Sequence, residues 1–446
     1  MKRKREKETK ELAKKRKRNK KELTFLGRII FVFDRISENI RNSSPVKTKI
    51  AKERALIKAR CGSDEGYANY AIKLRLLCLI ICVMLILTAS LGLIFSAGRL
   101  GVDDIYYMAK DIGYMNSYSE GGADTLNYTK TQTNADFALY KRGLAVASNS
   151  EIKLFNATGR VTLTSGDIYS TPVIATSNKY VMVYDLGAGR FSVYNSFKKL
   201  HSFTYDGSIA YASMSNDGAF AVVEKSQDYN SVVHIYDNDC KEINTYSCNE
   251  YVIAAEMSDN GKFVAVVAAT ANNGSMITEI TFLKQNKDEI YAQITVNGIT
   301  PYMCKFISDR RVAVFCSDRV RIYSVKGEMI SEFMYPESKL SYISYTDGAV
   351  SLMFEDDLLN EKNTLVVINK KGKVIHNGGI SGAYTDMQMH GENVFLLTNN
   401  GIIKYNYKTK ISVFKEIKDS YGQLLVCDKN RVLLCTDSRG IYIDIE

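Results

Sequence analysis

The residues of this sequence best suited to chemistry are acidic residues, asparagines and one tyrosine in three segments. The segments are 224–231, 268–279 and 354–363, and their candidate residues are Asp228, Tyr229, Asn272, Asn273, Asp356 and Asp357. Carboxylates on either side of a bond can act as general acid and general base. Asp356 and Asp357 are adjacent, so in an extended segment they point to opposite sides and need a partner from elsewhere to form such a pair. A binding rim, in which the six residues surround one ligand, needs no pair of this kind.

The sequence shows no pattern typical of a metal site or a nucleophile. Its four histidines, His201, His234, His376 and His390, have no ligand spacing, and the HExxH motif is absent. The run GGISGAY lacks the G-x-S-x-G order, and GAGRF at Gly187 is interpreted as a hairpin turn because no helix follows it. We therefore expect no catalytic residue, no metal and no cofactor.

Two nearly identical phrases indicate the architecture that positions these segments. MSNDGAFAVVE begins at Met214 and MSDNGKFVAVV at Met257. The same order of strand, tight turn, apolar strand, connection and hairpin occurs eight times, and its apolar strands begin at Leu144, Val181, Phe220, Phe263, Val312, Val350, Val394 and Val432. The spacings of 37 to 49 residues, with four strands in each unit, are typical of a β-propeller.

The last repeat supplies only three strands before the sequence ends, and one strand-like segment, 124–133, precedes the first repeat. Pairing these two would cover two exposed sheet edges. We therefore predict an all-β fold over 124–446, an eight-bladed β-propeller closed by an N-terminal strand. The three segments with candidate site residues connect second and third strands, and in a propeller such connections gather on one face.

The turns SNDGAF and SDNGKF resemble the S-x-D-G-K turn of WD40-like and TolB-like propeller repeats. Eight blades resemble the quinoprotein-dehydrogenase-like group. The sequence has no tryptophan, however, which removes the residues that this group uses between blades and the argument for its quinone cofactor. The whole layout resembles an uncharacterised family of membrane-anchored domain-of-unknown-function proteins of Gram-positive bacteria. These resemblances imply a fold and no particular chemistry.

The N-terminal quarter differs in character from the repeats. Residues 1–75 carry 24 Lys and Arg against 9 Asp and Glu, whereas the remainder carries 35 against 40. Between the two parts, 76–98 contains 23 residues without a charge, enough to cross a membrane as a helix. We predict a transmembrane helix at 73–98, a basic segment at 1–72 with an amphipathic helix at about 23–41, and a linker at 99–123. There are two alternatives to a transmembrane helix in this segment. It could be a helix buried in a core, or it could be removed by cleavage after Ala97 or Ser90.

The excess of basic residues before the predicted helix places the N-terminus in the cytoplasm and the repeats outside the cell membrane. The basic segment is interpreted as a tail attracted to anionic lipid, not to nucleic acid, because no aromatic residues interleave with it. Six cysteines lie in the repeats, and we interpret most of them as buried apolar residues. A disulfide between Cys240 and Cys248 is left open.

These observations predict a single-pass membrane protein whose propeller is a binding scaffold for a protein or a cell-envelope glycan, without catalysis. The alternative is a hydrolase or lyase of envelope polymers that uses the acidic residues of the connections. The sequence does not indicate the oligomeric state.

Overall fold

A computed structural model describes residues 55, 78, 81–89, 125–129, 135–287, 289–357, 359 and 361–445. The chain divides into two compact units, Met1–Val102 and Asp103–Glu446. In the first unit, residues 81–89 are helical with exposed side chains. Among the described residues, no helix reaches the length and apolar character that a membrane crossing requires. The predicted amphipathic helix, most of the predicted transmembrane helix and the linker lie outside the described residues.

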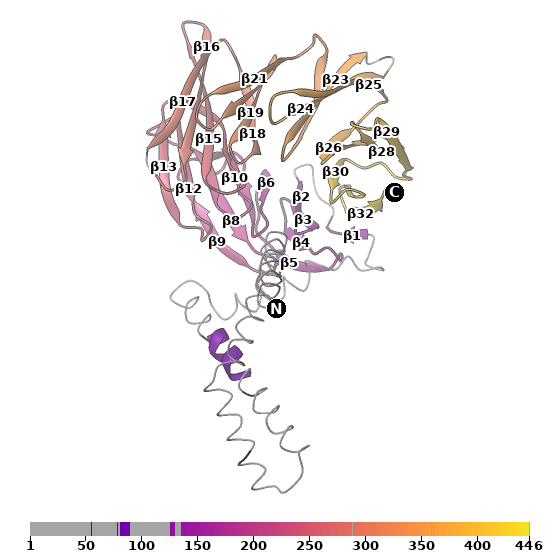
Figure 1. Cartoon of the computed structure of the whole chain (residues 1–446). Coiled ribbons are helices and arrows are strands. Elements are labelled where there is room, and N and C mark those ends of the chain that lie inside the picture. The colour runs from indigo at the N-terminus through magenta and orange to yellow at the C-terminus, as the bar shows by residue number, and fades with distance from the viewer. Residues whose placement is uncertain are drawn as a thin grey trace, which may run out of the picture. The chain divides into compact units, whose positions relative to one another are not determined.

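The second unit consists of eight four-stranded antiparallel sheets that follow one another in chain order as the blades of a propeller (Figure 1). This confirms the predicted all-β, eight-bladed fold. Blade 1 contains β2 (Asp136–Tyr140), β3 (Gly143–Ala147), β4 (Ile152–Phe155) and β5 (Val161–Ser165). Blade 2 contains β6 (Pro172–Thr176), β7 (Val181–Asp185), β8 (Arg190–Tyr194) and β9 (Lys199–Thr204). Blade 3 contains β10 (Ser208–Met214), β11 (Phe220–Lys225), β12 (Ser231–Tyr236) and β13 (Glu242–Cys248). Blade 4 contains β14 (Tyr251–Met257), β15 (Phe263–Asn272), β16 (Ser275–Lys284) and β17 (Ile290–Asn297).

The remaining blades repeat this order. Blade 5 contains β18 (Pro301–Ser308), β19 (Arg311–Cys316), β20 (Arg319–Ser324) and β21 (Met329–Met334). Blade 6 contains β22 (Lys339–Thr346), β23 (Ala349–Asp357), β24 (Lys362–Asn369) and β25 (Val374–Ser381). Blade 7 contains β26 (Asp386–His390), β27 (Asn393–Leu397), β28 (Gly401–Asn406) and β29 (Ile411–Glu416). Blade 8 contains β30 (Gln423–Val426), β31 (Arg431–Cys435), β32 (Arg439–Asp444) and, as its outermost strand, β1 (Thr125–Asn127).

The position of a strand in its blade determines its composition. Every residue of β3, β7 and β27 is buried, because a second strand is covered on both faces by neighbouring blades. The outermost strand β17 instead alternates between exposed and half-buried residues. The core therefore lies between successive blades, as in the apolar cluster that joins Val223 of blade 3 to Val264 and Val266 of blade 4.

Strand β1 pairs with β32 through Thr125, Leu126 and Asn127, although it comes more than 300 residues earlier in the chain. Leu126 is 1% exposed and packs in one apolar cluster with Leu144 of blade 1 and Leu433 of blade 8. The first and last blades therefore share a core, and the strand in this position is shorter than the segment 124–133 that the sequence indicated.

The antiparallel order gives the propeller two different faces. We call the turn face the end that carries the connections from first to second and from third to fourth strands. The backbone N–H of Asn178 in blade 2 donates to Asn216 O in blade 3, and Asn216 N–H donates to Asp259 O in blade 4, so these turns line up across blades. We call the loop face the opposite end, which carries the connections from second to third strands and the crossings between blades.

The repeated phrase forms two of these turns. Gly218 and Gly261 have φ angles of 95° and 68°, a left-handed conformation that glycine adopts without strain. A Cβ atom on Gly261 would approach the Asp217 carboxylate of the preceding blade to 2.9 Å. The two copies resemble each other because adjacent blades pack turn against turn.

Candidate functional site

The structure places the six predicted site residues at the loop face, but in three blades. Asp228 and Tyr229 lie between β11 and β12 of blade 3, and Asn272 and Asn273 lie at the tip of the β15–β16 hairpin of blade 4. Asp356 and Asp357 end β23 of blade 6, with blade 5 between them and the others. The prediction of long connections was wrong for segment 268–279, which forms two long strands and a tight turn. It was also wrong for most of segment 354–363, because β23 continues to Asp357 and β24 begins at Lys362.

Asp356 and Asp357 have different surroundings. Asp356 is exposed, and its carboxylate accepts hydrogen bonds of 2.6 Å from Ser338 Oγ and from Thr364 Oγ1. Asp357 Oδ1 accepts a hydrogen bond of 3.0 Å from the backbone N–H of Leu359, and Asp357 lines a cavity. The two adjacent carboxylates therefore do not act together on one group, as their spacing indicated.

The cavity lies at the loop face of blade 6 and has a volume of about 290 Å³. Its lining comes from the first three strands of blade 6 and the crossing to blade 7: Lys339, Leu340, Ser341, Tyr342, Glu355, Asp357, Glu361, Asn363, Gly382, Ala383 and Tyr384. Three carboxylates and two phenols thus surround the space, with one amine. Of the predicted site residues, only Asp357 belongs to it.

Irregular pairing shapes this end of the sheet. The register between β22 and β23 shifts between Leu340 and Tyr342, and the register between β23 and β24 shifts between Glu355 and Asp357. Such bulges bend a strand and redirect its side chains. They place consecutive residues of β22 along the cavity wall.

The contacts of Glu355 in the cavity are weak. Lys339 Nζ lies 3.8 Å from Glu355 Oε2, but the lysine side chain is 79% exposed, so water screens this contact. Ser341 Oγ donates a hydrogen bond of 3.5 Å to the same carboxylate oxygen. Glu355 itself is 23% exposed and is therefore accessible from the cavity mouth. The site is suited to a ligand that carries positive charge.

Hydrogen bonds hold the far wall of the cavity. Asn363 Nδ2 donates to Gly382 O at 2.9 Å, and Tyr342 OH donates to Tyr384 O at 2.7 Å. Burial raises the pKa of Tyr384 to about 12, and the charge of Glu361 adds to this effect. Both phenols therefore stay neutral near pH 7, because burial also raises the pKa of Tyr342.

The sequence indicated part of this site. Glu355 and Glu361 lie within the segment 354–363 that was singled out for its acidic residues. Tyr384 comes from GGISGAY, a run interpreted only as a blade crossing, and no sequence signal places it against β22. In the part of the chain that the structure describes, no group of three His, Cys, Asp or Glu side chains could hold a metal ion.

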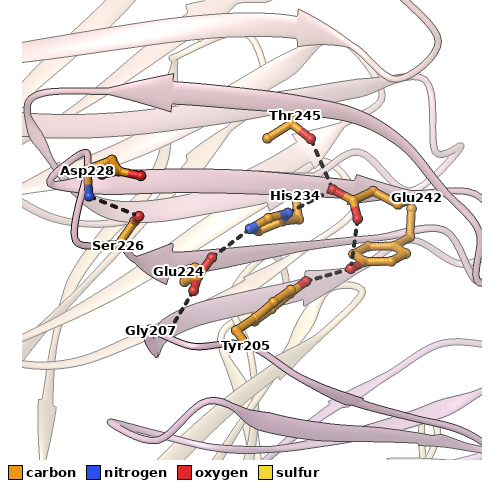
Figure 2. A network of polar contacts seen from close by, with 9 residues as sticks. Tyr205, Gly207, Glu224, Ser226, Asp228, His234, Glu242 and Thr245 are labelled. Carbon is orange, nitrogen blue, oxygen red and sulfur yellow. Dashed lines mark hydrogen bonds and ion pairs between the residues drawn. The ribbon is translucent and has the colours of Figure 1, made fainter.

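A second polar cluster lies beside the predicted residue Asp228, against blade 2 (Figure 2). His234 Nε2 is 3.0 Å from Glu224 Oε2, and His234 Nδ1 is 2.8 Å from Glu242 Oε1. The ring stacks on Tyr205 with centroids 4.5 Å apart. Each ring nitrogen of His234 is within hydrogen-bonding distance of a carboxylate oxygen. The imidazole is 13% exposed, and its partners occupy both nitrogens, so we interpret the cluster as a structural link within blade 3.

A third cluster joins the innermost strands of four successive blades. Lys305 Nζ of β18 is 2.9 Å from Glu256 Oε2 of β14, to which Tyr211 OH of β10 also donates at 2.6 Å. Tyr345 of β22 lies under the same amine, 5.5 Å from its ring centroid. Burial lowers the pKa of Lys305, but the charge of Glu256 outweighs it, so the pKa lies well above its usual value. The cluster is satisfied internally.

Disulfide bonds play no part in these sites. Cys240 and Cys248 are both free and buried. Cys240 lies in the core between blades 2 and 3 and Cys248 in the core between blades 3 and 4, so the bridge that was left open is not formed.

Comparison with known proteins supports the fold. Residues 117–444 match the model of a family described as "Family of unknown function (DUF5711)". The chain is similar in structure to Sqt1 of Saccharomyces cerevisiae, with 10% identity over 73% of this chain and 100% of that one and a TM-score of 0.52. It is similar to the WD40 domain of SCAP from fission yeast, with 10% identity over 72% and 97% of the two chains and a TM-score of 0.51. BamB from Moraxella catarrhalis matches with 11% identity over 73% and 99% and a TM-score of 0.47. No curated protein matches the sequence.

Proposed function

The chain belongs to this family of unknown function, and from its loop face we propose that it is a membrane-anchored binding scaffold that recognises a positively charged segment of a protein partner. The propeller is a fold commonly used for protein interactions. The observation that carries the proposal is the cavity of blade 6, whose described lining holds three carboxylates, Glu355, Asp357 and Glu361, and one amine, Lys339.

The charge of the surrounding face supports a cationic partner. Among the described residues of the connections at the loop face, ten are acidic and one, Lys418, is basic, while Lys225, Lys339 and Lys362 lie at strand ends on the same face. The acidic residues are Glu151, Asp167, Asp206, Asp228, Glu250, Asp318, Glu337, Glu361, Asp419 and Asp437. Such a face steers cationic segments toward it and rejects anionic ones.

Exposed apolar side chains on the same face support a protein partner rather than a free small cation. Tyr229, Tyr251 and Tyr302 are 45%, 56% and 45% exposed, and Leu359 is 93% exposed. Aromatic residues surrounded by polar ones are typical of protein interfaces. Tyr229, predicted as a site residue, therefore contributes to the proposed surface although it lies outside the cavity.

The anchor is proposed from the sequence and one observation on the first unit. In the described helical residues 81–89, Ile81, Leu85 and Ile86 are 49%, 61% and 68% exposed. Apolar side chains left uncovered along a helix are suited to lipid. With the basic residues before it, this segment supports a cytoplasmic N-terminus and a propeller outside the cell membrane.

Binding of a synthetic lysine-rich peptide to the full chain in detergent tests the proposed face. Fluorescence anisotropy should show saturable binding that weakens with added salt. The triple variant Glu355→Gln, Asp357→Asn, Glu361→Gln should lower the affinity at least tenfold, while the turn-face control Glu289→Gln, Glu328→Gln should leave it unchanged. Equal affinity of all three proteins would refute the proposed site.

A second candidate function is an envelope-polymer hydrolase or lyase, because the cavity brings more than one carboxylate to one space. Peptidoglycan and teichoic-acid fragments incubated with the full chain test it. Turnover that the Glu355→Gln or Asp357→Asn variant abolishes would establish catalysis, and binding of these glycans without turnover would shift the scaffold proposal to a glycan partner.

A further inference from the structure

Each of the seven third-to-fourth connections at the turn face contains a basic residue, and the excess of basic over acidic residues comes from blades 1, 2, 6 and 7. Among the described residues of these seven connections, ten are basic and four are acidic. The basic residues are Arg160, Lys198, Lys241, Lys287, Lys326, Lys370, Lys371, Lys373, Lys408 and Lys410. Blades 6 and 7 hold half of them, in the turns KKGK and YKTK, and all five of these lysines are exposed. The described first-to-second connections of the same face carry equal numbers of basic and acidic residues.

Exposed apolar residues accompany the basic turns. In five blades the first residue of the fourth strand is a large apolar residue, directly after or close to a basic turn residue: Val161, Ile290, Met329, Val374 and Ile411. Their exposed fractions are 50%, 45%, 56%, 37% and 63%. They stand at the rim of the turn face, because fourth strands begin there and are the outermost strands of their blades.

The turns form a fixed surface. Ser331 Oγ of blade 5 donates a hydrogen bond of 2.9 Å to Gly372 O in the lysine-rich turn of blade 6. A Cβ atom on Gly372 would come within 2.0 Å of the Ser331 side chain, so the two blades are in close contact here. The Arg311 guanidinium also donates to Lys370 O.

The chain enters the propeller at the same face. Thr125, the first residue of β1, pairs with Ile441 toward the end of β32, whereas Asn127 pairs with Arg439 at its start. Because β32 is a third strand, it ends at the turn face. The segment that follows the proposed membrane helix therefore joins the propeller on its basic side.

We propose that the turn face lies on the anionic headgroup surface of the membrane, with its lysines against lipid phosphates and its rim of apolar residues at the interface. The inference depends on the proposed anchor, because the anchor holds the propeller near a bilayer. Each lysine close to such a surface strengthens the contact about fivefold, and salt screens it. The acidic loop face then points away from the membrane, where a soluble or cell-wall-bound partner reaches it.

Site-specific photocrosslinking in vesicles tests this orientation. The full chain is reconstituted into phosphatidylcholine vesicles with or without 30% phosphatidylglycerol, with a photoreactive amino acid at Thr409 on the turn face or at Leu359 on the loop face. We expect lipid adducts from position 409 in anionic vesicles, at least fivefold fewer in neutral vesicles or at high salt, and none from position 359.

Two charge variants complete the test. Lys370→Gln, Lys371→Gln, Lys373→Gln should lower the yield at position 409 at least threefold, whereas Lys225→Gln, Lys362→Gln, Lys418→Gln on the loop face should not. A lipid adduct at position 359 instead of 409, or an adduct yield at position 409 that is the same in anionic and neutral vesicles, would overturn the proposal. Extraction with alkaline carbonate separates the two ideas: a released chain refutes the anchor, and an anchored chain without the 409 adduct refutes the orientation.

Discussion

Asp386 Oδ2 accepts a hydrogen bond of 2.7 Å from the backbone N–H of Leu424, and this bond joins the innermost strands of blades 7 and 8. Asp136 makes the same contact to Ile174, at 2.8 Å, between blades 1 and 2. In both cases the second carboxylate oxygen accepts the N–H of the next residue in its own strand. A carboxylate at the start of a first strand thus satisfies two backbone groups of neighbouring blades.

We expect Asp386→Ala to lower the free energy of unfolding by about 1–3 kcal/mol, because it leaves the Leu424 N–H buried without an acceptor. Asp386→Asn keeps one oxygen and should cost less. Urea unfolding followed by circular dichroism measures both. If Asp386→Ala and Asp386→Asn lower the free energy of unfolding equally, the hydrogen-bond acceptor does not account for the contribution of Asp386.

Replacing His234 should destabilise blade 3. In His234→Leu, the carboxylates of Glu224 and Glu242 lose the donor that lies between them, so we expect a loss of about 1–3 kcal/mol in unfolding free energy. His390 is exposed on the surface, and His390→Leu is the matched control. Two variants of equal stability would show that the contacts seen in Figure 2 contribute nothing net.

The free energy of unfolding should decrease as the pH is lowered, because of His376. Burial lowers the pKa of this imidazole below its usual 6.5, and the charge of Lys410 lowers it further. The unfolded chain then binds a proton more readily than the folded one. The stability that His376 contributes is therefore fully present above pH 6.5 and is lost as the pH falls toward the lower pKa of the folded state. Comparing unfolding at pH 7.5 and pH 5 in wild type and His376→Phe should show a smaller pH effect in the variant. An unchanged pH effect would assign it to other groups.

Leu126 should contribute more to the stability of the propeller than its position in a strand of three residues suggests. Truncation in Leu126→Ala opens a cavity in the core that blades 8 and 1 share, and we expect a loss of about 2–5 kcal/mol. The neighbouring side chain of Asn127 is exposed, so Asn127→Ala is the control. Thermal unfolding distinguishes them, and an equal Tm would mean that β1 contributes little to the ring.

The cysteines of the blades should resist alkylation. Burial raises the pKa of Cys240 to about 12 and that of Cys248 to about 11, so neither thiol ionises appreciably at pH 8. Mass spectrometry after iodoacetamide treatment should find both unmodified until urea is added, while an introduced thiol in Gln227→Cys, on an exposed loop, reacts fully. Rapid labelling in the folded protein would contradict the burial.

Particular residues show what the sequence could predict. The eight apolar second strands were evident because strands covered on both faces must be almost wholly apolar, as in β7 and β27. The hairpin of blade 4 was misinterpreted as a loop because its residues are small and polar. Asn273 and Gly274 have φ angles of 50° and 77°, and an Asn-Gly pair with two positive φ angles is a strong signal for a tight hairpin.

The cavity could be predicted only in part. Glu355 and Glu361 are close in the sequence, and their acidic segment was singled out. Tyr384 lies near them because the crossing to blade 7 passes over the beginning of β22, where Tyr342 OH donates a hydrogen bond to the Tyr384 carbonyl oxygen. That contact depends on the register shifts in β22 and β23, which no composition or spacing in the sequence indicates.

The pairing of β1 with β32 has a consequence for synthesis. Tyr128 OH donates a hydrogen bond to Thr436 O across 308 residues of chain. Strand β1 can therefore pair only after β32, the last strand, has been synthesised. During translation, seven blades can form while an uncovered edge persists at each end of the nascent domain. A chain that ends before β30 would lack blade 8, so the apolar faces of blades 7 and 1 that pack against it would stay exposed to water.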